Sequence, residues 1–462
     1  MLNSKAFLFY TFFALLLAVH FIFPSPALSE HPLLKKFIIA YNLRVLEKSL
    51  LDGSYRGEEG ILRIRPEIGK SLGMTIFIDK DYLDATMLFK EADISLEKAE
   101  KAMASQKKLK SPGEHYREIA DHFLLHKNTL ESARKKVMAY RSRLNSNVDD
   151  RQNDALGVKV MDRLLKESLK RTNNQLRDAL GYFYNLCQGV NVRNSTLTPE
   201  NVSFVNEVFY QFSKQASKET LNLFDLDQDN KHENKSLSFN WENVVGKKGS
   251  QYVPLLEVIS NKLDDEIYTV DPLLFLALMR RESNFDAHAI SPVGAVGLTQ
   301  IMPKTGKGLG MKNIYLPEYF NKAVSLAVRE RKTRGEAMAV LSQINEANKM
   351  PYAKRARELM QKSLTLGEEK MSLFMRYREE LLRERADDRL RPSQAMEYGL
   401  RYFAGLMKQQ RGDISLALAS YNAGPYSVEK YKGIPPYAET VFFRNWVLRY
   451  YRDYLVKAQE TP

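Results

Sequence analysis

The chain has 462 residues, a length that favours two domains or one domain with large additions. Its apolar fraction of 44% and charged fraction of 27% are those of a globular protein, which excludes a disordered chain. The net charge of +13 suits polyanionic partners such as nucleic acid, anionic lipid or a bacterial wall. The sequence has no RNP-type motif, zinc-finger spacing or basic leucine zipper, so we expect no nucleic-acid partner.

Residues 1–29 are typical of a targeting segment. An uncharged apolar run, Ala6–Phe23, follows a lysine and precedes Pro24, Pro26 and a small-x-small signature at Ala27–Ser29. This pattern predicts a cleaved signal peptide and a periplasmic protein. The run also reaches the length of a marginal membrane span, so an uncleaved N-terminal anchor is the alternative. No cysteine follows it, which argues against a lipidated N-terminus.

Residues 30–250 have a mainly helical pattern, and we predict an N-terminal helical domain of unknown role. Seven apolar residues recur at steps typical of one face of an amphipathic helix: Met161, Leu165, Leu169, Leu176, Leu180, Phe183 and Cys187. The alternation within Ile61–Asp79 allows one or two strands. No internal repeat stands out.

Few side chains in this half suggest a metal or a redox centre. Cys187 is the one cysteine and lies on the apolar face, which favours a small buried side chain over a reactive thiol. Asp225–Ser236 imitates a calcium loop but has Asn230 where glycine is required and Ser236 where a bidentate Glu is required, so a solvated linker is favoured. We expect no cofactor and no metal.

A new apolar pattern begins at Val253, so we place a domain boundary near residue 250 and a catalytic domain over 251–462. Within it, residues 321–390 are densely charged and have few helix breakers, which predicts helices inserted as an exposed excursion. This insertion and the 30–250 domain are both candidates for binding a protein partner. We expect a monomer.

One carboxylate in the second domain has a position suited to acid chemistry. Asp271 and Pro272 have the residue types of an N-cap and a first helical position, and they begin an apolar helix. Glu282 follows Leu278 by four residues and Phe275 by seven, which places it at the C-terminal end of the apolar stripe. Partial burial and the helix C-terminus would both raise its pKa. The alternative is a surface Glu paired with a neighbouring arginine.

Two later motifs favour the catalytic interpretation. Ser291–Pro303 is a loop with glycines at 294 and 297 that would permit close backbone approach by a ligand. Asp413 would cap a second apolar helix that stops at Ala423–Gly424, with Tyr421 and Asn422 at its end. Glu282-Ser283, Gly294–Gln300 and Ala419–Gly424, in this order, resemble the motifs of the soluble lytic transglycosylase family, which has a goose-type lysozyme fold.

The resemblance implies a lysozyme-like, mostly helical catalytic domain. It implies Glu282 as acid and then base, with substrate-binding side chains at Ser291, Gln300, Met302, Tyr421, Asn422 and Glu439. Three residues depart from the usual family pattern: Thr299 in place of Met, Ser420 in place of Ala, and Phe443 in place of Tyr. The long interval between Gln300 and Tyr421 reflects the charged insertion.

A single carboxyl suffices if the substrate supplies its own nucleophile, whereas most glycosidases need two. The resemblance therefore implies cleavage of the peptidoglycan bond between N-acetylmuramic acid and N-acetylglucosamine, with a 1,6-anhydro product. One alternative is lysozyme-like hydrolysis with Asp286 as the second carboxylate. Another is a non-catalytic scaffold that binds the wall.

Overall fold

The computed structural model describes residues 32–106, 111–190, 197–221, 240–263, 268–384 and 386–460. These residues are mainly helical and contain no strand, only isolated bridges, which confirms the predicted fold class. None of their helices is long and apolar enough to cross a membrane. The predicted targeting segment 1–29 and the calcium-like sequence 225–236 lie outside the described residues.

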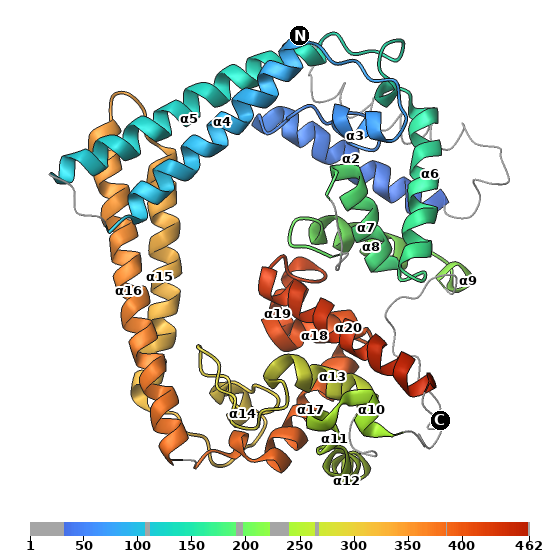
Figure 1. The fold of residues 1–462 in the computed structure, drawn as a ribbon, viewed down its shortest axis with the longest axis vertical. Coiled ribbons are helices and arrows are strands. Elements are labelled where there is room, and N and C mark those ends of the chain that lie inside the picture. Colours follow the sequence, from blue (N-terminus) through green and yellow to red (C-terminus); the bar gives the residue numbers. More distant parts are fainter. Residues whose placement is uncertain are drawn as a thin grey trace. The chain divides into compact units, whose positions relative to one another are not determined.

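The helices, whose labels are those of Figure 1, have the following bounds. They are α2 (Pro32–Asp52), α3 (Pro66–Ser71), α4 (Lys80–Ala104), α5 (Pro112–Arg141), η2 (Asp150–Gln152), α6 (Asp154–Arg171), α7 (Leu176–Gln188), α8 (Val202–Gln215), α9 (Lys218–Leu221), α10 (Trp241–Val245), α11 (Lys247–Ser250), α12 (Val253–Leu263), α13 (Pro272–Ser283), α14 (Pro303–Gly308), α15 (Glu318–Ser342), α16 (Lys349–Glu384), η3 (Asp388–Leu390), α17 (Pro392–Gln409), α18 (Ile414–Ala423), α19 (Pro425–Tyr431) and α20 (Ala438–Glu460).

The chain divides into two compact units, each built from separate stretches of sequence. The first unit contains Met1–Asp79, Ala139–Asp227 and Tyr426–Val441. The second contains Lys80–Met138, Gln228–Pro425 and Phe442–Pro462. Helix α20 begins in the first unit and continues in the second.

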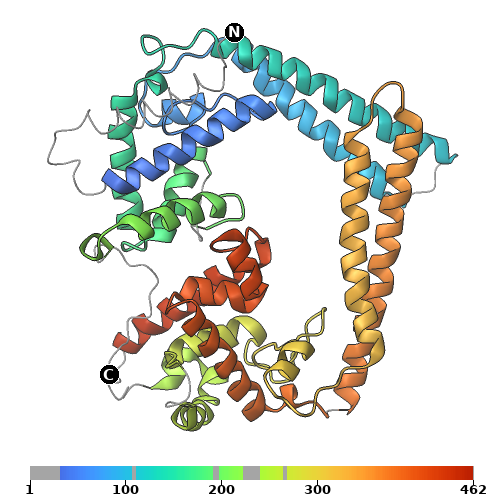
Figure 2. The same cartoon turned by 180° about the vertical axis from the view of Figure 1, so that it is seen from behind.

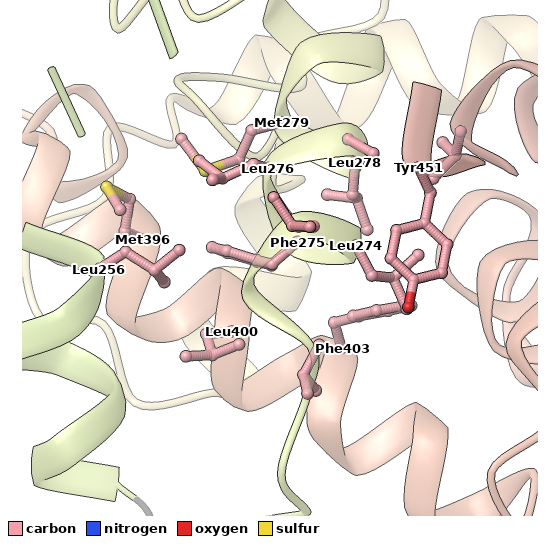
Figure 3. Close-up of a cluster of buried hydrophobic side chains, with 14 of the residues drawn as sticks. Leu256, Leu274, Phe275, Leu276, Leu278, Met279, Met396, Leu400, Phe403 and Tyr451 are labelled. Carbon is pink, nitrogen blue, oxygen red and sulfur yellow. The ribbon is translucent and has the colours of Figure 1, made fainter. Parts of the chain in front are cut away.

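The core of the second unit surrounds α13. Every residue from Leu273 to Met279 is buried. Figure 3 shows Phe275 of this helix among Leu400 and Phe403 of α17, with Tyr451 of α20 nearby. A helix that is apolar on all sides requires cover on all sides. The core therefore fixes α13 and the residues at its C-terminal end.

Two helical hairpins, α4–α5 and α15–α16, also belong to the second unit and pack against each other (Figures 1 and 2). Buried residues of one hairpin (Met103, Ile119) share a cluster with residues of the other (Leu341, Ala353). Arg357 of α16 donates to the carbonyl of Ala102 at 2.7 Å. The predicted charged insertion is thus a helical hairpin that packs against another hairpin of the same chain.

In the first unit α2 packs on α8, and α7 contacts both α6 and α8. The prediction of strands within Ile61–Asp79 was wrong. This segment contains a turn, the short helix α3 and an extended stretch whose Phe77 amide donates to the Asp149 carboxylate at 3.3 Å. Ile61, Ile64 and Met74 are buried whereas Ile78 is exposed, so the apolar alternation does not correspond to one buried side.

The apolar stripe from Met161 to Cys187 belongs to two helices, so its prediction as one helix was wrong. Asn173 and Asn174 have φ of 51° and 60°, and this left-handed turn separates α6 from α7. Asparagine tolerates that conformation because its short polar side chain can bond locally. Cys187 is buried, as predicted, and burial raises the pKa of its thiol to about 12.

Candidate functional site

Glu282 lies at the half-buried C-terminal end of α13. The helix begins as predicted, because the Asp271 side chain accepts a hydrogen bond from the Leu273 amide at 2.7 Å and Pro272 occupies the first turn. The helix ends at Ser283, and the C-cap residue Asn284 has a left-handed φ of 51°. Glu282 therefore belongs to the last turn of a helix whose residues 273–279 are buried.

The two arginines before Glu282 lie against aromatic rings of α20. The Arg280 guanidinium is 4.1 Å from the ring centroid of Tyr450, and that of Arg281 is 5.9 Å from the ring of Phe443. Such contacts stabilise a cation without a carboxylate. Arg280 also donates to the Tyr454 hydroxyl at 3.4 Å.

Tyr421 of α18 lies close enough to Glu282 to be influenced by its charge. Burial raises the pKa of Tyr421 well above its ordinary value, and the negative charge of Glu282 raises it further. The Tyr421 hydroxyl donates to the Thr299 carbonyl at 2.6 Å, and its ring stacks on Phe443 at 6.5 Å. Tyr421 therefore links α18 to the glycine loop, and its raised pKa keeps it a neutral phenol near Glu282.

The glycine loop is tied directly to the end of α13. The Ser283 hydroxyl donates to the Leu298 carbonyl at 2.9 Å. Gln300 has a positive backbone φ of 47°. Its side-chain Nε2 donates to the carbonyls of Ala289 and Gly297 at 3.0 and 2.8 Å. Both hydrogens of the side-chain amide are thus used within the protein, which leaves the side-chain oxygen Oε1 as the group able to accept a hydrogen bond from a ligand.

The other predicted residues are distributed as follows. The Ser291 hydroxyl oxygen accepts from the amides of Val293 and Ala295, at 3.3 and 2.9 Å, and so shapes its own turn. Met302 precedes α14 and packs half-buried against an apolar cluster. Asn422 is half-buried next to Tyr421. Glu439 is exposed in the first turn of α20 and belongs to the first unit.

A buried ion pair that holds the glycine loop, here called the clamp, was not predicted from the sequence. Arg389 is 0% exposed and pairs with Asp387 through its Nε and Nη2 atoms, at 2.9 and 2.6 Å. It also donates to the carbonyl of Ile301 at 3.1 Å and to the Tyr377 hydroxyl at 2.6 Å. A Cβ at Gly297 would lie 1.8 Å from the Arg389 carbonyl oxygen. The clamp thus fixes the loop that carries Gln300.

The site has one central carboxylate and no metal cluster. Asp286 is exposed and accepts from the amide of His288 at 2.9 Å. The described residues contain no group of three or more His, Cys, Asp or Glu side chains that could hold a metal ion. The arrangement offers one proton donor and acceptor, Glu282, beside a neutral phenol and an amide.

Comparisons with known proteins find similarities to transglycosylases. Residues 261–328 and 369–440 match the family model described as Transglycosylase SLT domain. A 50-residue stretch is 44% identical to "Transglycosylase" of Enterobacteria phage PRD1, covering 11% of this chain and 19% of that protein. The X-ray structure of an inactive mutant of lytic transglycosylase Slt from Pseudomonas aeruginosa matches at 12% identity over 94% of this chain and 74% of that chain, with a TM-score of 0.28.

The family match includes all seven predicted site residues. Its first part contains Glu282, Ser291, Gln300 and Met302, and its second contains Tyr421, Asn422 and Glu439. The segment between the two parts lies within the α15–α16 hairpin.

Proposed function

We propose, on the premise that the chain carries a transglycosylase SLT domain, that it cleaves the glycan strand of peptidoglycan at the bond between N-acetylmuramic acid and N-acetylglucosamine. The observation that carries this proposal is Glu282, set half-buried at the end of a buried helix beside Tyr421. The family match supplies the substrate class. The targeting segment 1–29 favours action in the periplasm, where this polymer lies.

In the proposed reaction, protonated Glu282 gives its proton to the glycosidic oxygen, and the bond from that oxygen to C1 of the muramyl residue breaks. The Glu282 carboxylate then takes the proton of the muramyl C6 hydroxyl, whose oxygen forms a new bond to C1. The products are a 1,6-anhydro-muramyl end and a free 4-hydroxyl on N-acetylglucosamine. No water is consumed, and Glu282 returns to its protonated state.

The neighbouring groups fit this sequence of steps. Tyr421 stays neutral because its pKa is raised, so it adds no second negative charge when Glu282 ionises. The carbonyl oxygen of Gln300 is suited to accept from a sugar hydroxyl or N-acetyl amide. We propose that Asn422 and Ser291 bind the sugar, while Met302 supplies an apolar contact. Glu439 is proposed as a further contact outside the central group.

The decisive experiment replaces the acid and identifies the product. We expect Glu282→Gln to lower kcat on purified peptidoglycan at least about 100-fold, the range attributed to a general acid and base. Asp286→Asn is the matched control, because Asp286 is exposed and only four residues away. We expect this variant to keep nearly full activity.

Mass spectrometry of the released fragments separates the alternatives. We expect anhydro-muramyl ends from wild type. Reducing muramic acid ends, together with loss of activity in Asp286→Asn, would instead establish a hydrolase with two carboxylates. Sedimentation with peptidoglycan without any released fragment would establish a wall-binding scaffold. Full activity in Glu282→Gln would refute the proposal.

A further inference from the structure

The loop beside Glu282 occurs a second time in the chain, in the first unit. Gly57–Met74 aligns without a gap with Gly294–Met311, and nine of these eighteen positions are identical. Gly60 and Gly297 both have positive φ, of 71° and 80°. A Cβ on either would meet a backbone carbonyl oxygen, at 2.1 and 1.8 Å. The two loops therefore have the same backbone requirement at the same position.

The buried clamp is also duplicated, with equivalent bonds. In the first unit Arg151 pairs with Asp149 through Nε and Nη2, at 2.9 and 2.8 Å. It donates to the Ile64 carbonyl at 3.1 Å and to the hydroxyl of Tyr140. Arg389 makes these four bonds to Asp387, Ile301 and Tyr377. The guanidinium thus holds the same loop carbonyl in each unit, since Ile64 aligns with Ile301.

The helices follow in the same order, and two of the corresponding pairs have equal lengths. Helices α4 and α15 both have 25 residues, and α6 and α17 both have 18. Each pair, and the pair α7 and α18, starts 238 positions apart. The turn before α7 and the turn before α18 both contain two consecutive residues of positive φ. Residues 32–215 therefore repeat the framework that begins at residue 272.

The repeat identifies the residue that occupies the position of Glu282 in the first unit. The Asn42 side chain donates to the carbonyl of Ile61 at 3.0 Å, as Ser283 donates to that of Leu298 at 2.9 Å. Ile61 and Leu298 are aligned positions of the two loops. Asn42 thus corresponds to Ser283, and the preceding residue, Tyr41, corresponds to Glu282.

Other site residues are replaced as well. Arg63 aligns with Gln300 and shares its positive φ, 51° against 47°. Phe183 stacks on Phe204 at 6.3 Å, as Tyr421 stacks on Phe443 at 6.5 Å. The residue after Phe183 is Tyr184, which therefore stands where the second unit has Asn422. The first unit has an arginine and two phenols where the second has a carboxylate and two amides.

This group has the chemistry of a binding site without an acid. Arg63 donates to the Tyr184 hydroxyl at 3.3 Å, and its Nε is buried with no hydrogen-bond partner among the described residues. Burial raises the pKa of Tyr41, and the nearby Tyr184 raises it further. The neighbouring carboxylate, Glu207, is held by Arg44 through two bonds of 2.6 and 2.7 Å. An unsatisfied guanidinium N–H beside aromatic rings suits an anionic sugar, because arginine binds carboxylates and aromatic faces pack on sugar rings.

We propose that the first unit contains a non-catalytic binding site for the same glycan. In this site Arg63, together with Tyr41 and Tyr184, binds a carboxylate-bearing saccharide. The identity of the glycan rests on the proposed function. The absence of a carboxylate at the Tyr41 position means that this copy holds a strand without breaking it. A chain with one catalytic copy and one binding copy would remain bound to the wall between cleavage events.

The test counts bound saccharides by isothermal titration calorimetry on the full chain carrying Glu282→Gln. The probe is a tetrasaccharide of alternating N-acetylglucosamine and N-acetylmuramic acid with free lactyl carboxylates. We expect two bound molecules per chain, and one after the further change Arg63→Gln, with affinity at the lost site reduced about tenfold or more. Chitotetraose, which has the same length and no carboxylate, should bind the first unit more weakly by a similar factor.

Lys159→Gln is the matched control, because it removes one positive charge from an exposed position of the same unit. We expect it to leave both sites intact. Tyr184→Phe deletes only the hydroxyl that Arg63 contacts and should weaken the first-unit site while preserving the fold. Unchanged stoichiometry and affinity in both Arg63→Gln and Tyr184→Phe would overturn the proposal. Residual cleavage by Glu282→Gln would overturn only the proposed function, because binding at Arg63 is measured without reference to product.

Discussion

Removing the guanidinium of Arg389 tests whether the buried clamp supports the site. In Arg389→Met, Asp387 stays 0% exposed and loses both side-chain bonds from the arginine. The Ile301 carbonyl and the Tyr377 hydroxyl lose a donor as well. Breaking a buried ion pair by removing one partner costs about 3–5 kcal/mol. We expect a loss of this size in the free energy of unfolding.

Urea unfolding followed by tryptophan fluorescence is a suitable assay. The chain has two tryptophans, Trp241 and Trp446, and both belong to the second unit with the clamp. Arg391→Met is the control, because the Arg391 side chain is 59% exposed and its bond to Asp388 is 3.4 Å long. Because the Arg391 side chain is solvent-exposed and the ion pair is long, we expect it to contribute about 0–1 kcal/mol.

A double variant separates the buried charge from the lost packing. Asp387→Asn combined with Arg389→Met removes both charges, so we expect it to be more stable than Arg389→Met alone. Activity on peptidoglycan should fall in the single variant, because Gln300 lies in the loop that the clamp holds. The reasoning is refuted if Arg389→Met is no less stable than Arg391→Met.

Three further outcomes follow from the second unit. Gly297→Ala should yield unstable, inactive protein, because Gly297 has a φ of 80° and the new Cβ would lie 1.8 Å from a carbonyl oxygen. Gly308→Ala is the control: its Cβ would have no atom within 4 Å, so this variant should behave as wild type in thermal melts. Tyr421→Phe should lower the free energy of unfolding by about 1–3 kcal/mol, since it leaves a buried carbonyl unsatisfied, and should lower kcat. Hydrogen bonds from two tyrosines, and then from an arginine, lower the pKa of Glu380 to about 2, so its stabilising effect is complete above about pH 4.5 and lost as the pH falls towards 2. Glu380→Gln should therefore flatten the acid limb of the stability curve, and an unchanged limb would contradict this assignment.

Local signals in the sequence predicted the parts of the site that depend on few residues. Asp271 and Pro272 specified the start of α13, and the spacing from Phe275 and Leu278 placed Glu282 at its end. These rules act within one helix, so they need no knowledge of tertiary contacts. The strand prediction for Ile61–Asp79 failed because a short alternating pattern does not distinguish a strand from a turn, a short helix and an extended stretch.

The duplication escaped prediction because the repeated residues are few and lie in loops. The identical positions cluster in Gly57–Met74 and its counterpart, and in the two Asp-Asp-Arg sequences that begin at Asp149 and Asp387. Helices α4 and α15 kept the same length and not the same residues, since many apolar side chains can fill a core position. A search for the recurring Asp-Asp-Arg could have shown the repeat, but its meaning depends on the carbonyls that each arginine contacts.

Comparison of the two copies within this chain distinguishes the residues that hold the loop from the residues that differ between the two sites. Residues that hold the loop are the same in both copies: an arginine, an aspartate, a tyrosine and a glycine of positive φ at the same point. Residues at the end of α13 and in the loop differ, as Glu282 and Gln300 do from Tyr41 and Arg63. Identity in the buried clamp is explained by packing alone. A carboxylate at Glu282 and a phenol at the matching Tyr41 are expected where one copy performs a reaction and the other does not, because function lies in the site and not in the fold.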